Sequence, residues 1–207
     1  MVPSVTELVV ALGLRPYLVG RTRYCIHPSA VLVDVPKVGG TKYVRVERVR
    51  ALTPTHVIVN ADENHRETVD ALRDEFEAEL ALTQARGWTP REVLYLIWRD
   101  PWMTITRDTY ISSMLVTVNW HTLPALEGGA TGAARYPLVD AGAPWLAGVE
   151  RILLSSEPYP FAPRDVEAAQ QLAPRASVEC IDGELVSWYG PRAATGLRYL
   201  RRLAAHE

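Results

Sequence analysis

The 207-residue sequence has no concentrated stretch of positive charge and no long apolar run. Its 22 lysines and arginines are dispersed and are balanced by 24 acidic residues, which leaves no basic face for a nucleic-acid backbone. No apolar run approaches the ~18 residues that a membrane helix needs. We therefore expect neither a nucleic-acid partner nor a membrane segment.

Cysteine is also scarce. Only Cys25 and Cys180 are present, far apart and without a CxxC pair, so free thiols in a reducing compartment are the preferred interpretation. The first four residues, MVPS, have neither the basic nor the apolar segment of a signal peptide. As written, the sequence predicts a cytoplasmic protein, or a periplasmic one if the true start lies upstream.

Standard catalytic motifs are missing as well. The sequence contains no GxSxG elbow, no Walker A loop, no GxGxxG after a strand and no HExxH. Their absence lowers the expectation of an enzyme and favours a binding function.

Hydrophobic patterns predict an α/β fold with parallel-rich sheets, because strands alternate with helices along the chain. Short apolar or β-branched runs indicate strands at residues 17–20, 55–60, 92–98, 149–155 and 177–181. Helical spacing and breakers indicate helices at residues 8–14, 44–52, 64–86, from about 108, 163–172 and 191–205.

Two helix starts have recognisable caps. Ser4 and Glu7 form a capping-box pattern in front of the first helix, and Asp108 is most simply the cap of a later one. The two strand–helix series suggest two small lobes joined by the long amphipathic helix. We expect an N-terminal lobe over residues 1–63, a linking helix over 64–90 and a C-terminal lobe over 91–207.

Aromatic residues gather in three predicted loops, each directly after a strand. These loops are residues 98–103 (WRDPWM), 155–161 (SSEPYPF) and 182–190 (DGELVSWYG). Ligands of open α/β sheets bind outside the carboxyl ends of the strands, so the three loops should converge. Any single aromatic residue is more simply a cap on the core, but the three clusters together indicate a site for a large planar ligand.

A second, weaker candidate is the predicted loop around Cys25 and His27. A thiolate and an imidazole can both bind soft or borderline metals, which makes His27 a candidate metal ligand. Two such residues make at most half of a metal site, so a packed cysteine beside a hydrogen-bonded histidine is the favoured interpretation.

Several longer strings resemble one known family. In the first half these are residues 2–7 (VPSVTE), 19–25 (VGRTRYC), 37–42 (KVGGTK) and 52–60 (LTPTHVIVN). In the second half they are residues 95–99 (YLIWR), 107–110 (RDTY), 154–161 (LSSEPYPF), and 182–184 with 188–190 (DGE and WYG). They are similar to the helical-backbone metal receptors, the class III periplasmic binding proteins that bind cobalamin and siderophores. Compared with that family, the N-lobe is shortened between residues 72 and 92.

The resemblance implies two lobes that close on a metal chelate, with cobalamin or a related corrinoid as the expected ligand. An iron siderophore or haem is the alternative ligand. On the N-lobe the implied contacts are the helix start at residues 4–6, Tyr24, Cys25 and Lys42. On the C-lobe the implied ligand-binding residues are Trp98, Arg99, Trp102, Tyr159, Phe161, Trp188 and Tyr189. Glu157 is implied as a docking or rim residue.

The same resemblance suggests partners. An ABC-transporter permease is the expected partner if the chain is exported, and a homodimer could cover a sheet edge exposed by the shortened lobe. Two other functions are considered beside the binding protein. One is an enzyme with Cys25 as nucleophile and Glu157 or Asp182 as acid or base, and the other is a degenerate cleft that acts as a protein-interaction module.

Overall fold

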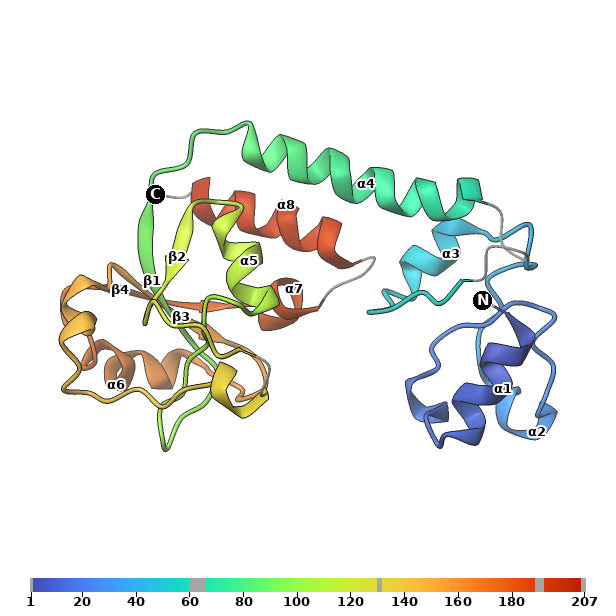
Figure 1. The fold of residues 1–207 in the computed structure, drawn as a ribbon, viewed down its shortest axis with the longest axis horizontal. Coiled ribbons are helices and arrows are strands. Elements are labelled where there is room, and N and C mark those ends of the chain that lie inside the picture. Colours follow the sequence, from blue (N-terminus) through green and yellow to red (C-terminus); the bar gives the residue numbers. More distant parts are fainter. Residues whose placement is uncertain (1, 60–65, 130–131, 189–191, 206–207) are drawn as a thin grey trace. The chain divides into compact units, whose positions relative to one another are not determined.

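The computed structural model describes residues 2–59, 66–129, 132–188 and 192–205 (Figure 1). The chain divides into two compact units. Unit 1 comprises Met1–Glu79 and Tyr189–Thr195, and unit 2 comprises Leu80–Trp188 and Gly196–Glu207. The helices α4 (Arg66–Gln84) and α8 (Arg192–Ala205) each begin in unit 1 and end in unit 2.

Unit 2 is built on a four-stranded parallel sheet. Its strands are β1 (Arg91–Leu96), β2 (Trp120–Thr122), β3 (Arg151–Ser155) and β4 (Ser177–Ile181), and their order is β2-β1-β3-β4. Val93 of β1 is aligned both with Thr122 of β2 and with Arg151 of β3. The central strands are buried on both faces, which explains why they are continuous apolar runs rather than alternating ones.

Helices cover both faces of this sheet (Figure 1). The helix α6 (Val166–Gln170) packs against β3 and β4 on one face. On the other face lie α5 (Tyr110–Val116), α7 (Gly183–Ser187) and the second half of α8. An apolar cluster lies on the α6 face and contains Leu94 and Leu96 of β1 with Ile152 and Leu154 of β3. Burying one such side chain contributes about 2 kcal/mol to folding.

The opposite face of the central strands carries a buried polar pair. Tyr95 of β1 donates to the hydroxyl oxygen of Ser155 at 2.9 Å. Burial raises the pKa of Tyr95, so its hydroxyl stays a hydrogen-bond donor at ordinary pH. The Ser155 hydroxyl in turn donates to the backbone carbonyl of Glu157 at 2.6 Å, which ties the end of β3 to its following loop.

Unit 1 consists of short helices and loops. It contains α1 (Pro3–Ala11), a 3₁₀ turn (Arg15–Tyr17), α2 (Ser29–Leu32), α3 (Val46–Ala51) and the first part of α4. Among its described residues no strand forms, and only isolated bridges join Arg21 to Lys37 and Gly39 to Val44. The unit therefore has no sheet around which a core could form.

A buried arginine organises unit 1 instead. The Arg21 side chain, in a residue only 7% exposed, donates to the carbonyl of Leu32 at 3.0 and 3.2 Å and to the carbonyl of Cys25 at 2.8 Å. These bonds tie the loop after α1 to the end of α2. Buried carbonyls need such partners, because an unsatisfied one costs about 1–3 kcal/mol.

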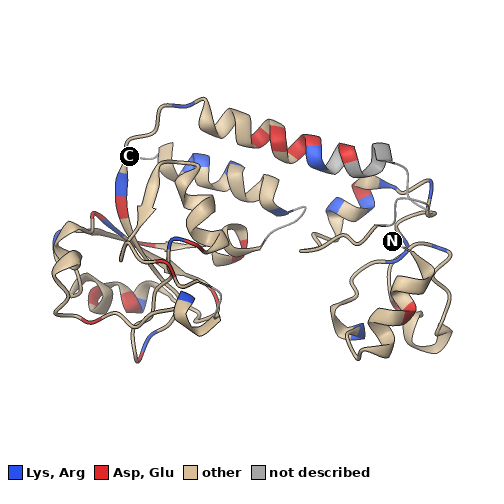
Figure 2. Ribbon diagram, in the orientation of Figure 1, with Lys and Arg blue, Asp and Glu red and all other residues tan. Residues whose placement is uncertain are grey.

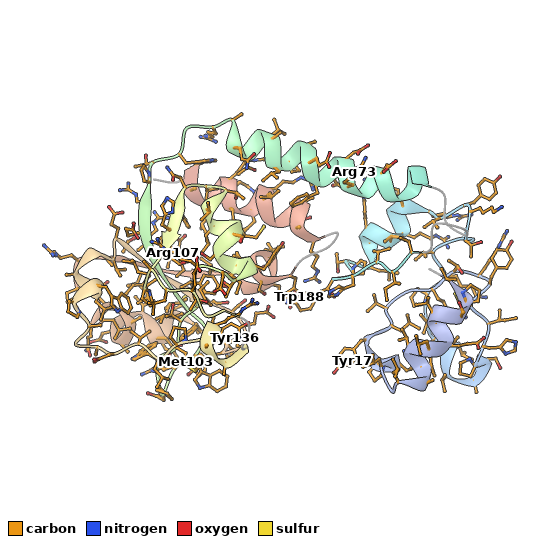
Figure 3. The ribbon with its side chains drawn as sticks, viewed as in Figure 1. Tyr17, Arg73, Met103, Arg107, Tyr136 and Trp188 are labelled. Carbon is orange, nitrogen blue, oxygen red and sulfur yellow. The ribbon has the colours of Figure 1, made fainter. Side chains whose placement is uncertain are left out.

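The surface of α4 is strongly charged. Arg73 lies within 2.9–3.4 Å of the carboxylates of Asp70, Asp74 and Glu77 (Figure 3). Figure 2 shows acidic residues concentrated on this helix, while lysine and arginine are spread over many elements.

Both strands predicted in unit 1 are wrong. Residues 17–20 begin in the 3₁₀ turn, and Tyr17 projects from the surface with 79% of its area exposed (Figure 3). Residues 55–59 form no strand, and Ile58 is 52% exposed, while Asn60 lies outside the described residues. Among the described residues, neither apolar run is paired with a neighbouring strand, which a strand requires.

The predicted helix caps also differ from the structure. The helix α1 begins at Pro3, whose fixed φ suits the first helical position, so Ser4 lies inside the helix and does not cap it. Thr109, not Asp108, caps α5, because its hydroxyl accepts the N–H of Ser112 at 3.3 Å.

The α/β fold with a parallel sheet is confirmed. The predicted strands at 92–98, 149–155 and 177–181 correspond to β1, β3 and β4, and the helices at 44–52, 64–86 and 163–172 are present with small shifts of their ends. The short strand β2 was not predicted. In the described parts of the chain, no helix is long and apolar enough to cross a membrane.

Candidate functional site

The loops after β1, β3 and β4 leave the sheet at its carboxyl edge. Because β2 lies beside β1 on the side away from β3, the strand order reverses between β1 and β3. Such a reversal opens a crevice at the carboxyl ends of the two strands, where α/β proteins bind their ligands. The aromatic loops predicted from the sequence therefore begin at the position where a ligand site is expected.

The loop after β1 is a rigid hairpin. The backbone N–H of Met103 donates to the carbonyl of Trp98 at 3.1 Å, and the N–H of Ile97 donates to the carbonyl of Met103 at 3.0 Å. Asp100, at the tip, adopts a left-handed conformation with φ of 60°, which aspartate tolerates better than most residues. Two aromatic side chains, those of Trp98 and Trp102, are thus carried on an ordered turn.

Four aromatic rings meet between this hairpin and the loop after β3. The Trp98 and Tyr159 rings are 5.6 Å apart and almost perpendicular, and the Tyr159 and Phe161 rings are 4.6 Å apart. Trp102 stacks on Phe161 at 6.0 Å with an angle of 6° between the planes. Trp98 is 42% exposed, whereas Phe161 is buried in the apolar cluster. Phe161 therefore supports the platform and does not offer a free face to a ligand, in contrast to its predicted role.

Arg99 is held at the base of the same platform. Its guanidinium bonds to the buried carboxylate of Asp165 and lies 5.5 Å from the centre of the Trp102 ring. Burial alone would raise the pKa of Asp165, but the N–H of Ala162 and the Arg99 guanidinium outweigh it and lower that pKa. The ion pair neutralises most of the charge that Arg99 was predicted to offer to a ligand.

Glu157 joins the loop after β3 to the segment after β4. Its carboxylate accepts a hydrogen bond from the Trp188 indole N–H at 2.6 Å and another from the Ser187 hydroxyl. Gly183, in the segment after β4, packs against the end of β3, and a Cβ on Gly183 would lie only 2.2 Å from the Ser155 hydroxyl oxygen. Glu157 is half-buried and holds two hydrogen bonds, and its predicted role as a docking or rim residue stays a prediction. The predicted convergence of the three loops is confirmed, while Tyr189 lies outside the described residues.

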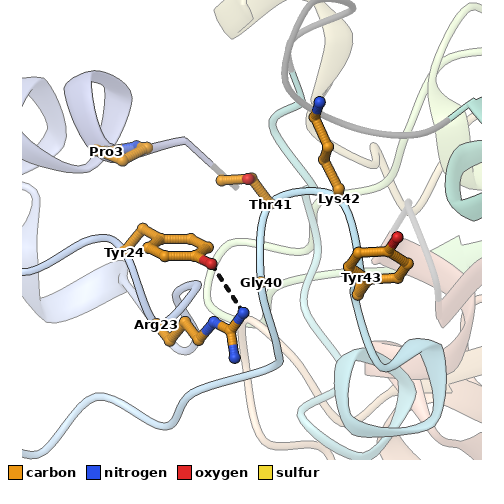
Figure 4. Close-up of a pocket in the computed structure, with 7 residues that line it drawn as sticks. All are labelled: Pro3, Arg23, Tyr24, Gly40, Thr41, Lys42 and Tyr43. Carbon is orange, nitrogen blue, oxygen red and sulfur yellow. Dashed lines mark hydrogen bonds between the residues drawn. The ribbon is translucent and has the colours of Figure 1, made fainter.

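Unit 1 carries a pocket of its own, with a volume of about 400 Å³. It is lined by Pro3 at the start of α1, by Arg23 and Tyr24, and by residues 40–43 (Figure 4). Tyr24 and Lys42, both predicted as ligand contacts, lie in its wall. The pocket thus brings Tyr24 and Lys42 together, whereas Ser4 and Thr6 are absent from the lining, and the ligand role of these residues stays a prediction.

The pocket contains a fixed cation. Arg23 donates to the hydroxyl oxygen of Tyr24 at 2.8 Å, and its guanidinium lies 4.8 Å from the centre of the Tyr24 ring. A Cβ at Gly40 would lie 3.4 Å from the Tyr24 ring, at ordinary contact distance, so Gly40 packs next to this pair. Figure 4 shows the pair beside the 40–43 loop, with Lys42 extending from the loop.

Cys25 and His27 do not form a metal site in this structure. Cys25 is 1% exposed and its sulfur lies 3.1 Å from the Thr22 hydroxyl, so the predicted ligand contact of Cys25 is wrong. His27 is exposed. Within the described ranges, no group of three or more His, Cys, Asp or Glu side chains could hold a metal ion.

Sequence reasoning missed Arg23 and Asp165. An exposed arginine beside a tyrosine carries no pattern of its own, and Asp165 looked like an ordinary first-turn acidic residue after Pro163. The contacts that make them notable are seen only in the structure: Arg23 donates to Tyr24, and Asp165 accepts from Arg99.

The sheet and its aromatic loops define unit 2 as an α/β domain of the doubly wound type. No protein-family model matches the sequence, and no curated protein matches it. Solved structures match it over nearly their whole length, at low identity. An ABC transporter substrate-binding protein from Listeria monocytogenes EGD-e has a TM-score of 0.59 and 13% identity, covering 100% of this chain and 97% of its own.

Two further solved structures match this chain over a similar share of its length. A possible iron-binding (periplasmic solute-binding) protein from Staphylococcus epidermidis ATCC 12228 has a TM-score of 0.55 and 14% identity, with 97% and 95% of the two chains covered. S. aureus IsdE complexed with heme has a TM-score of 0.50 and 17% identity, with 98% and 96% covered. At these identities the likeness is one of fold, and the chain has the fold of periplasmic substrate-binding proteins.

Proposed function

We propose that this protein binds a planar metal chelate. The observation that carries the proposal is the aromatic platform at the reversal point of the unit 2 sheet, where Trp98 and Tyr159 meet on ordered loops. Stacked or edge-on rings favour flat, polarisable ligands, and a pre-formed platform loses little entropy on binding. Trp98 offers the exposed face.

The neighbours in fold support the same class of ligand. One is described as a possible iron-binding protein and another was solved in complex with heme. We infer that an iron chelate or a porphyrin is the first ligand to test, and cobalamin stays a prediction from the sequence. An ABC-transporter permease is the corresponding proposed partner, supported by the description of the Listeria neighbour as a transporter's substrate-binding protein.

We propose binding rather than catalysis, because the groups considered for an enzyme have structural partners. The Cys25 thiol is enclosed beside Thr22, and the Glu157 carboxylate accepts two hydrogen bonds. Asp182 caps α7 by accepting the N–H of Leu185 at 3.3 Å. These contacts leave the candidate nucleophile and acid occupied.

The test is a titration of the purified full chain with haemin, cyanocobalamin and a ferric siderophore, followed by tryptophan fluorescence. We expect saturable quenching at micromolar concentrations for at least one chelate. Replacing Trp98 by alanine should weaken that binding about tenfold, or ~1.4 kcal/mol, because one stacking face is lost.

Tyr136→Ala is the matched control, since Tyr136 is an exposed aromatic residue of unit 2 outside the platform. It should leave the affinity unchanged. If no chelate quenches the fluorescence of the wild-type chain, the proposal is wrong, and a role as a protein-interaction module becomes the better explanation.

A further inference from the structure

We propose that unit 2 carries a docking edge for a second copy of this chain, formed by residues 136–140 and centred on Leu138. The inference goes beyond the proposed function and does not depend on the ligand. It is carried by the backbone groups that this segment leaves without a partner among the described residues, and by the register in which two copies of the segment match.

Residues 136–140 form the outer edge of a small antiparallel ladder next to the loop after β1. Met103 is the bridge partner of Trp98 on one side and of Leu138 on the other. Exposure alternates along the segment, because residues 136, 138 and 140 are exposed while residue 137 is half-buried and residue 139 is buried. This alternation is typical of a strand with one face packed on its own domain. The outer face of the segment therefore presents Tyr136 and Leu138, and Leu138 is 63% exposed.

The inward hydrogen bonds of the ladder determine which backbone groups point outward. The Pro137 carbonyl accepts the N–H of Thr104 at 3.0 Å, and the Val139 N–H donates to the Trp102 carbonyl at 2.8 Å. Because successive strand residues direct their N–H and C=O groups to opposite edges, those of Leu138 point away from the ladder. In the part of the chain that the structure describes, neither group has a hydrogen-bond partner. Pro137 lacks its N–H on the inward side, so it does not block the outer edge.

Two copies of this edge complement each other in one register. In an antiparallel pair centred on Leu138, the two Leu138 residues exchange a pair of hydrogen bonds, and Tyr136 lies opposite Asp140 of the second copy. The Asp140 N–H and the Tyr136 carbonyl are unpaired among the described residues, so each copy adds one further bond. The remaining groups of that pair are already used, because the Tyr136 N–H donates to Ala133 at 3.2 Å and the Asp140 carbonyl accepts from Ala143 at 3.0 Å.

The charges of the segment favour the same pairing. Residues 136–139 are uncharged, so no like charges oppose each other at the centre. The Asp140 carboxylate faces Tyr136 of the second copy, whose hydroxyl is a hydrogen-bond donor. The neighbouring Arg135 is engaged within its own copy by Asp108 at 3.5 Å.

The two edges of the main sheet suit a second copy less well. Glu179 is the central residue of β4, and two copies paired about it would bring two carboxylates face to face. On β2 the Thr122 carbonyl already accepts a hydrogen bond from the Arg107 guanidinium at 3.1 Å. Both comparisons assign the second copy to the 136–140 edge.

The contact is small, so the dimer is expected to be weak. A single short strand pair buries less than the ~1,200 Å² at which stable complexes begin. We therefore expect a dissociation constant on the order of 100 µM. Monomers prevail under the micromolar conditions of the ligand titration.

The test is sedimentation equilibrium of the full chain from about 5 µM to about 500 µM, a range that brackets this constant. We expect the weight-average mass to rise from that of the monomer towards twice that value. Leu138→Pro should weaken dimerisation roughly thirtyfold, because each copy loses an N–H donor for which the described part of the monomer has no acceptor.

Charge variants test the register. Leu138 faces its own counterpart at the two-fold axis, so Leu138→Lys alone and Leu138→Glu alone should each remain monomeric through like-charge repulsion. An equimolar mixture of these two variants should dimerise at least as tightly as the wild type, because opposite charges then meet. Leu82→Lys changes another exposed leucine of unit 2, on α4, and should associate like the wild type.

Three results would overturn the inference. A wild-type chain that stays monomeric at the highest concentration has no docking edge for a second copy. If the Leu138→Lys and Leu138→Glu variants fold, as judged by circular dichroism, and associate like the wild type, the dimer uses another surface. If their mixture stays monomeric, Leu138 does not lie at the two-fold axis. Chelate binding is measured separately and is affected by none of these results.

Discussion

The interior of unit 1 and the interior of unit 2 are stabilised in different ways. Unit 2 buries the apolar side chains of a parallel sheet between helices. Unit 1 has no strand among its described residues, and it buries the charged side chain of Arg21 together with apolar residues such as Leu32 and Val38. The chain entropy lost on folding is thus offset in unit 2 by a sheet-centred apolar core. In unit 1 the hydrogen bonds of the buried Arg21 side chain, here called the hub of unit 1, contribute to the same compensation.

The difference also concerns the sites. The platform of unit 2 is aromatic, with its one arginine neutralised by Asp165, whereas the pocket of unit 1 has a net positive lining. The aromatic cluster and the cation-lined pocket thus lie on separate parts of the described chain. The following substitutions test the comparison, beginning with the largest expected effect.

Removing a core side chain from the unit 2 sheet should cost most. Leu154 of β3 is fully buried in the apolar cluster, so Leu154→Ala should lower the free energy of unfolding by about 3–4 kcal/mol through lost burial and the cavity left behind. Urea denaturation monitored by circular dichroism measures the change. Leu138→Ala, at an exposed position, is the control and should cost less than about 0.5 kcal/mol. Equal effects of the two substitutions would contradict a sheet-centred core.

Removing the hub of unit 1 should have the next largest effect. Arg21→Gln cannot reach the carbonyls of both Leu32 and Cys25, so we expect a loss of about 2–3 kcal/mol. Hydrogen exchange should show the loss as faster exchange of unit 1 amides, with Arg45→Gln unchanged. An Arg21→Met variant as stable as the wild type would show that packing, not the hydrogen bonds, holds this unit.

A methyl group at Gly183 should disturb the platform at its junction. The added Cβ would overlap the Ser155 hydroxyl and press on Glu157, so Gly183→Ala should cost about 1–3 kcal/mol and weaken chelate binding. The control is Gly87→Ala, because a Cβ at Gly87 would meet nothing within 4 Å. Unchanged stability and affinity in Gly183→Ala would mean that the segments after β3 and β4 can separate freely.

The smallest expected effect is a pH dependence in unit 2. The Thr106 hydroxyl and then the N–H groups of Gly128 and Gly129 lower the pKa of Asp108 from 3.8 to about 2. Its stabilising contribution is therefore present above pH ~4 and is lost as pH falls towards 2. Between pH 4 and pH 2 the melting temperature of Asp108→Asn should fall less than that of the wild type. Parallel curves for the two proteins would refute this assignment.

The sequence was a good guide to unit 2 and a poor one to unit 1. The apolar runs of β1, β3 and β4 each have a paired neighbour, so the pattern and the structure agree. Residues 17–20 and 55–59 show the same kind of pattern without a neighbouring strand, and they remain outside any sheet. β2 was missed because three residues are too few for a periodic signal.

The candidate site was predictable where it depends on strand order and less so where it depends on pairing of side chains. Loops after parallel strands converge as a matter of topology, and the rings of Trp98 and Tyr159 meet there. The burial of Cys25 and the hydrogen bonds of Glu157 depend on contacts with distant residues. No local sequence pattern predicts such contacts.

The parallel order of the strands also shapes how unit 2 acquires its structure. β1 pairs with β2 and β3, and both lie beyond long intervening segments. The Tyr95 hydroxyl, for example, donates to Ser155, which is 60 residues further along the chain. Contacts of this kind must wait for long loops to close, which slows folding compared with hairpin-built proteins. A nascent chain can pair the first residues of β1 with β2, but it carries Leu94, Tyr95 and Leu96 unpaired until β3 has been synthesised. During that interval it is a natural client for a chaperone, and unassisted refolding at high concentration competes with aggregation.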